Sequence, residues 1–93
     1  MDTLLEYRAE IDRIDAAIRT LFIQRMETVA KISEWKSSHD IPVYDHAREE
    51  TVMKISLEAI ENPEYRQYFQ EVLTSLMKVS KAYQKALVMR GIL

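Results

Sequence analysis

The sequence predicts an all-α fold in which each chain contributes three helices, the first of them very long. The 93 residues include one glycine and two prolines, so few positions interrupt a helix. From Leu4 to Lys36, a series of apolar and charged residues follow one another at intervals that alternate between four and three positions. This is the spacing of a helix face that packs against other helices. This stripe consists of Leu4, Arg8, Ile11, Asp15, Ile18, Phe22, Arg25, Val29, Ile32 and Lys36.

The first predicted helix runs from about Thr3 to Ser37, because no glycine or proline lies in this range. At ~1.5 Å per residue it is ~50 Å long. A compact globule of this chain length has a radius of gyration of only ~12 Å, so the rest of the chain is too short to cover such a rod. We therefore expect a partner chain, and a homodimer in which two copies of the first helix pack antiparallel about a two-fold axis would supply it.

The second predicted helix follows a loop over residues 38–43. Pro42 favours the loop because it lacks a backbone donor and disfavours helical conformation at the residue before it. Asp45 is a suitable N-cap, and the helix is expected to end before Asn62. The predicted inner face consists of Val52, Met53, Ser56 and Ile60.

The third predicted helix begins with Asn62 as its cap and Pro63 at its first position, and it runs to about Met89. Gly91 then supplies a stop. Ser80 and Gln84 share the inward face of this helix with an apolar stripe. That stripe consists of Phe69, Val72, Leu73, Leu76, Tyr83 and Leu87.

Composition excludes several classes of function. A net charge of −2 argues against nucleic acid as a partner. The chain has no cysteine and no apolar run approaching ~18 residues, and residues 1–6 lack the basic region and apolar core typical of a signal peptide. We therefore expect a cytoplasmic protein without a membrane segment. No nucleophile triad, glycine-rich phosphate loop or metal-ligand cluster is recognisable, so we expect any chemistry to depend on binding and electrostatics. The predicted organisation is one soluble domain over residues 1–93.

Three cations on the long stripe predict an anion site, because a buried cation without a partner is costly. Arg25 and Lys36 are eleven residues apart, which is ~1100° of rotation, so they share a face. They lie ~16 Å apart along the axis and can converge on one small ligand. Arg8 lies ~25 Å from Arg25 and can reach this ligand only from a partner chain.

Each polar group also has a plainer interpretation. Arg25 and Lys36 can form ion pairs with Glu49 or Asp45, and Arg8 can pair with Asp15 of its own or the partner helix. Ser80 and Gln84 can form an ordinary buried contact between helices. The residues Asp45, Arg48 and Glu49 can be a helix cap followed by an exposed charge pair.

Taken in order, the polar residues resemble the active-site signature of the all-helical, intertwined class of chorismate mutases. The opening segment Tyr7–Asp15, an arginine seventeen positions after Arg8 and a lysine eleven further on resemble the first helix of that class. The block Asp45–Glu49 resembles the entry to its second helix. The matching positions are Arg8, Arg25, Lys36, Asp45, Arg48, Glu49, Ser80 and Gln84.

The resemblance implies an isomerase that rearranges chorismate to prephenate in phenylalanine and tyrosine biosynthesis, without a cofactor. By similarity, Arg25 and the partner chain's Arg8 bind the substrate carboxylates with help from Ser80. Lys36 and Gln84 donate to the ether oxygen. Glu49 and the start of the second helix at Asp45 receive the ring hydroxyl, and Arg48 orients Glu49. The implied catalytic groups are Lys36, Gln84, Arg25 and Glu49.

Two other functions remain open from the sequence. Isochorismate-pyruvate lyases share the helical dimer and the arginines, but those we can compare lack the acidic residue that matches Glu49. A non-catalytic helical dimer or a regulatory chorismate-binding subunit is the second alternative. Feedback by phenylalanine or tyrosine and docking on another enzyme of the shikimate pathway are not decided by the sequence.

Overall fold

A computed structural model describes residues 2–91 and contains three helices and no strand in that part of the chain. They are α1 (Thr3–Ser38), α2 (His46–Glu58) and α3 (Pro63–Met89). The predicted all-α class with a long first helix is therefore confirmed. Met1, Ile92 and Leu93, which the predicted domain includes, lie outside the described residues.

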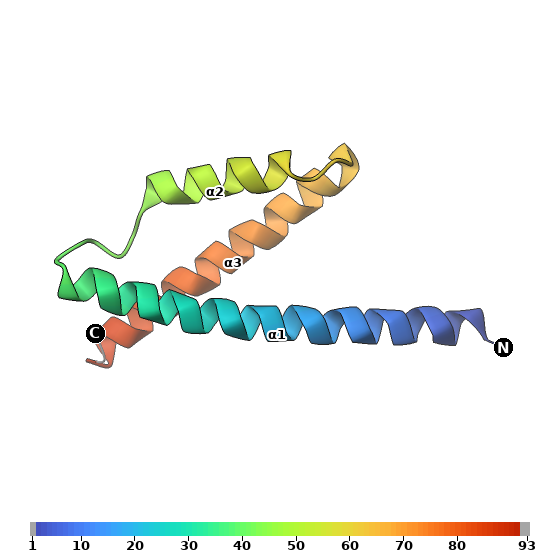
Figure 1. The fold of residues 1–93 in the computed structure, drawn as a ribbon, viewed down its shortest axis with the longest axis horizontal. Helices are drawn as coiled ribbons and strands as arrows, with labels where there is room; N and C mark the ends of the chain where they lie inside the picture. Colours follow the sequence, from blue (N-terminus) through green and yellow to red (C-terminus); the bar gives the residue numbers. More distant parts are fainter. Residues whose placement is uncertain (1, 92–93) are drawn as a thin grey trace.

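The third helix links the other two, since α3 packs against both α1 and α2. Figure 1 shows α3 crossing α1 in its C-terminal half and diverging from it elsewhere, while the N-terminal end of α1 projects beyond both other helices. The radius of gyration is 16.9 Å, well above the ~12 Å of a compact chain of this length. None of the helices in the described part is long and apolar enough to cross a membrane.

Side-chain caps begin all three helices. The Asp45 carboxylate accepts a hydrogen bond from the Arg48 backbone N–H at 2.9 Å, and the Asn62 side chain accepts one from Glu64 N–H at 3.0 Å. Both caps were predicted, as was Pro63 in the first turn of α3. Asp2 caps α1 in the same way, with 3.0 Å to Leu4 N. Each cap satisfies a donor that the helix itself cannot pair.

The end of α1 differs from the prediction by one residue, since the helix includes Ser38. Asp40 adopts the left-handed conformation, with φ at 54°. The Ile41 N–H then bonds back to the Lys36 carbonyl at 2.9 Å, and the Asp40 N–H bonds to Ser37 O at 3.4 Å. These are the two hydrogen bonds of a Schellman motif, which closes the last helical turn.

Few side chains are buried within a single chain. Leu73 and Leu87 on α3 are each 5% exposed, and Ser80 is buried beside them. Ser33 is fully buried on α1, whose helix neighbour is α3. Val72, predicted on the same apolar stripe of α3, is 51% exposed. The predicted inner face of the second helix is half-buried at Val52, Met53 and Ser56, whereas Ile60, also half-buried, lies beyond the end of α2 at Glu58.

The N-terminal half of α1 is exposed in the single chain. Within residues 3–24, every side chain except Ala16 is exposed, including Ile11, Ile18 and Phe22 of the predicted stripe. The prediction that this part of the stripe is buried is therefore wrong within one chain. The physical reason is that α3 contacts α1 only around their crossing and then diverges from it, while α2 packs on α3, so neither helix covers this half (Figure 1).

Candidate active site

A groove of about 360 Å³ lies where the three helices meet, within the size range of small-ligand pockets. Its polar lining comes from all three: Arg25 on α1, Arg48 and Glu49 on α2, and Ser80, Lys81 and Gln84 on α3. A smaller recess shares several of these residues and adds Lys36 and Asp45. The structure thus brings together all the residues predicted for the site except Arg8.

Arg8 is exposed on the projecting half of α1 and lines neither the groove nor the recess. Because α1 is unbroken from Thr3 to Ser38, the ~25 Å between Arg8 and Arg25 along its axis cannot be shortened by bending at a break. Arg8 therefore does not reach the groove of its own chain.

Arg25 is half-buried and bonded to uncharged groups of α3. Its Nη1 donates to the Ser80 hydroxyl and, at 3.5 Å, to the Leu76 carbonyl. The Ser80 hydroxyl in turn donates to the same carbonyl at 2.8 Å. These bonds orient the guanidinium without neutralising it, so its charge stays available for an anion.

Lys36 is half-buried near the C-terminal end of α1. Its ammonium donates to the Val43 carbonyl at 3.2 Å, across the loop that joins α1 to α2. An ammonium has three donors, and this neutral acceptor takes one of them. The lysine is therefore held beside the recess, and its ammonium can still donate further hydrogen bonds.

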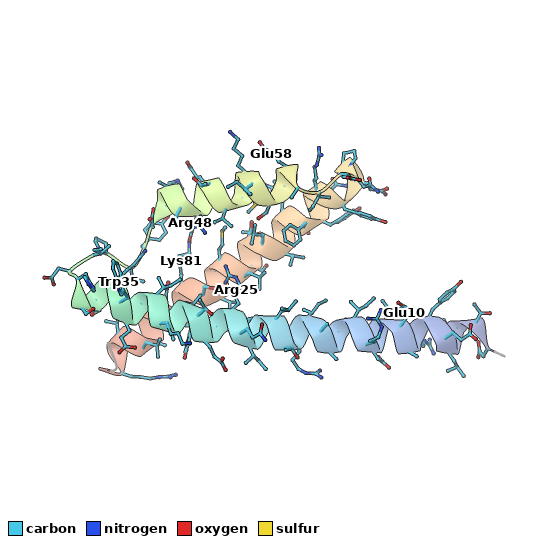
Figure 2. All side chains as sticks on the ribbon, viewed as in Figure 1. Glu10, Arg25, Trp35, Arg48, Glu58 and Lys81 are labelled. Atoms are coloured by element: carbon cyan, nitrogen blue, oxygen red, sulfur yellow. The ribbon has the colours of Figure 1, made fainter. Side chains whose placement is uncertain are left out.

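The start of α2 presents two charged side chains to the groove. Figure 2 shows Arg48 on α2, opposite Arg25 on α1 and Lys81 on α3. Glu49 is half-buried, and the ion pair that it makes is with Lys81, at 3.3 Å. The sequence prediction instead gave Arg48 the role of orienting Glu49, and Arg48 makes no side-chain hydrogen bond or ion pair within residues 2–91.

Two lining residues were missed from the sequence. The Lys81 ammonium lies 5.0 Å from the centre of the Tyr44 ring, and both side chains line the recess. Lys81 directly follows Ser80 and is four residues after Met77, which also lines the groove. This four-residue spacing could have indicated Lys81 from the sequence. It places Lys81 on α3 beside the inward face that contains Gln84.

The lining is positively charged in a chain whose net charge is −2. Groove and recess contain four cations and two carboxylates, a local charge of +2. The members of this set are Arg25, Lys36, Arg48, Lys81, Asp45 and Glu49.

The plainer ion-pair interpretations are not seen within the single chain. Among residues 2–91, ion pairs join Arg13 with Glu10 and Lys81 with Glu49, and the His46 imidazole lies 2.8 Å from the Glu50 carboxylate. Arg25 and Lys36 therefore do not pair with Glu49 or Asp45, and Arg8 does not pair with Asp15 of its own helix. Residues 2–91 contain no cluster of three or more His, Cys, Asp or Glu side chains able to hold a metal ion. What remains is a small, donor-rich cationic groove.

Comparison with known proteins identifies the family. Residues 7–85 match the family model described as chorismate mutase type II. The chain belongs to the chorismate mutase type II family. It is also 31% identical over 83 residues to the T-protein of Haemophilus influenzae, a match that covers 88% of this chain and 22% of that protein. The chain therefore spans about a fifth of the length of this curated relative.

Family membership confirms the resemblance drawn from the ordered polar residues and the assignment of an enzyme of the isomerase class. The matched range contains every residue predicted for the site, from Arg8 to Gln84.

Proposed function

We propose that residues 1–93 form one chorismate mutase domain that converts chorismate to prephenate in the cytoplasm, for phenylalanine and tyrosine biosynthesis. The observation that carries this proposal is the groove of charge +2 built from all three helices of a chorismate mutase type II chain. Chorismate carries two carboxylates, an ether oxygen whose bond breaks and a ring hydroxyl. A site for it needs two cationic groups, donors at the ether and an anchor for the hydroxyl.

Arg25 binds one carboxylate of the substrate. Its planar guanidinium can grip a carboxylate through two parallel hydrogen bonds, and the contact with Ser80 presets its orientation. Ser80 assists with its hydroxyl. Two separated clamps select the compact conformation in which the enolpyruvyl arm folds over the ring, and this removes part of the entropic barrier.

The second clamp is Arg8 of a partner chain in an intertwined homodimer. Support comes from the exposed half of α1, where Ile11, Ile18 and Leu21 are each more than half exposed. Burying such a side chain contributes roughly 1.5–3 kcal/mol. Two antiparallel copies of α1 cover each other's exposed half and bring each Arg8 to the groove of the other chain.

Lys36 and Gln84 donate to the ether oxygen. Cleavage of the C–O bond runs ahead of C–C bond formation, so this oxygen gains negative charge in the transition state. A donor that strengthens as charge develops raises the rate, and each can contribute roughly 3–4 kcal/mol. The carboxamide of Gln84 donates at any pH, whereas a carboxylic acid there would have to stay protonated.

Glu49 and the start of α2 at Asp45 receive the ring hydroxyl. Glu49 is half-buried in the lining of both groove and recess, which suits an acceptor inside the site. Arg48 adds positive potential from the same turn of α2.

Ultraviolet measurement of chorismate loss, with prephenate identified as the product, tests this function. Incubation with isochorismate is the matched second arm. Prephenate from chorismate supports the mutase. Release of pyruvate from isochorismate without prephenate from chorismate would assign a lyase instead. Binding of chorismate without turnover would assign a regulatory subunit.

A further inference from the structure

Lys81 joins α3 to α2 at the edge of the groove. Its Nζ lies 3.3 Å from Glu49 Oε1 and 5.0 Å from the centre of the Tyr44 ring. Tyr44 belongs to the segment before α2, so Lys81 contacts both that segment and the first turn of the helix. Figure 2 places Lys81 between the three helices.

The surroundings of this pair strengthen the attraction between the charges. The Glu49 side chain is 25% exposed and that of Lys81 is 44% exposed, so both are partly removed from water. Coulomb attraction is stronger in such an environment than at an open surface. The Tyr44 ring provides a second favourable contact for the ammonium and limits the positions that the lysine can adopt.

One turn of α3 therefore contacts a charged group on α1 and a charged group on α2. Ser80 and Lys81 are adjacent, and their side chains leave the helix ~100° apart. Ser80 contacts Arg25 on α1, and Lys81 contacts Glu49 on α2. The spacing between the arginine and the carboxylate is thus set by one rigid turn.

We propose that Lys81 is a positioning residue of the site, holding the Glu49 carboxylate where it accepts the ring hydroxyl of the substrate. This inference rests on the proposed function and gives Lys81 the orienting role that the sequence prediction gave to Arg48. An ionised carboxylate has about four lone-pair sites. The contact with Lys81 uses one, and others remain for a hydroxyl donor.

The proposal predicts which kinetic constant changes. The ring hydroxyl does not take part in bond making or breaking, so Glu49 binds it equally in the substrate and in the transition state. Loss of such uniform binding raises KM and leaves kcat unchanged. A residue that served only to tie α2 to α3 would alter thermal unfolding without this kinetic pattern.

Steady-state kinetics on the full chain test the proposal with three single variants. Lys81→Met removes the charge and keeps the apolar stem, Lys81→Arg keeps the charge, and Lys54→Met is the matched control. Lys54 is exposed on α2, lines neither groove nor recess, and makes no hydrogen bond or ion pair in the described part of the chain. We expect Lys81→Met to raise KM about tenfold with kcat within about twofold, Lys81→Arg to restore KM to within about threefold, and Lys54→Met to match the wild type.

A double-mutant cycle with Glu49→Gln tests whether Lys81 acts through Glu49. If it does, adding Lys81→Met to Glu49→Gln changes kcat/KM by less than about twofold. A further loss of about tenfold in the double variant would overturn the proposal by showing that Lys81 binds the substrate itself. Unchanged KM in Lys81→Met, with only a lower Tm, would overturn it in favour of a structural tie.

Failure of this inference is distinguishable from failure of the proposed function. A wild-type chain that forms no prephenate overturns both. A wild-type chain that forms prephenate, together with a Lys81→Met variant of wild-type kinetics, overturns only the role of Lys81.

Discussion

The two halves of α1 carry one continuous stripe but lie in different surroundings. From Arg25 to Ser38 the helix lies beside α3 and the loop, and Arg25, Val29 and Lys36 are half-buried. From Thr3 to Gln24 the stripe is exposed throughout. The C-terminal part of the stripe is thus partly covered by the chain's own helices, although Ile32 remains 46% exposed, whereas α2 and α3 cover none of the N-terminal part.

The cations of the two halves differ in the same way. Arg25 and Lys36 are already oriented by hydrogen bonds to a hydroxyl and to backbone carbonyls. Arg8 makes no such bond within residues 2–91. The chain's own residues therefore orient the cations near the C-terminal end of α1, whereas they leave Arg8 unoriented.

The largest effect is expected when a charged residue is introduced into the exposed N-terminal part of α1. Ile18→Glu places two carboxylates in the proposed dimer interface, and burial of an unpaired charge costs several kcal/mol. We expect loss of the dimer in sedimentation velocity and loss of more than about 100-fold in activity, because each groove then lacks its second arginine. Thr20→Glu, on the opposite face of the same exposed stretch, is the control. A dimeric and active Ile18→Glu variant would contradict the proposed packing.

The second largest effect is expected for a substitution in the C-terminal part of α1, which lies beside α3. Lys36→Ala removes a donor that acts in the transition state, so kcat is expected to fall at least about 100-fold. Thermal unfolding by circular dichroism should change little, since the lost bond is one contact to Val43. Lys31→Ala, an exposed lysine of α1, controls for the loss of charge. Unchanged turnover would remove Lys36 from the mechanism.

The third prediction joins the two halves. In a mixed dimer of Arg8→Ala and Lys36→Ala chains, both lesions fall in one site and the other site is intact. Random exchange makes about half of the dimers mixed, so activity should recover to about a quarter of the wild-type level. Mass spectrometry of the intact dimers establishes exchange. No recovery after exchange would show that the sites are not shared.

The smallest effect is at the end of α1. Asp40 has a φ of 54°, a conformation that glycine adopts without steric cost. Asp40→Gly should therefore raise the free energy of unfolding by roughly 0.5–1 kcal/mol and leave kcat within about twofold. Urea denaturation measures the first quantity. A destabilised variant would mean that the Asp40 side chain makes a favourable contact in the dimer.

Features with a local cause were predictable from the sequence. The caps at Asp45 and Asn62 depend on side chains that bond to N–H groups two or three residues away. The convergence of Arg25 and Ser80 followed from helix periodicity and the family resemblance.

Features that depend on a particular backbone path or on a neighbouring helix were not predictable. The end of α1 depends on Asp40 adopting a conformation more typical of glycine. The bond from Lys36 to the Val43 carbonyl depends on the path of the loop. Lys81 looked like an ordinary lysine on the flank of α3, and only the position of α2 shows that it meets Glu49.

Ser33 is completely enclosed, and its hydroxyl has no partner within the described residues. A side chain this small permits a close crossing of α1 and α3, and the hydroxyl itself contributes no bond there. Because Arg25 and Ser80 lie on those two helices and line the groove, the separation of α1 and α3 at Ser33 also sets the width of the groove. A larger side chain at Ser33 would push the two helices apart and widen the groove without changing any residue that lines it.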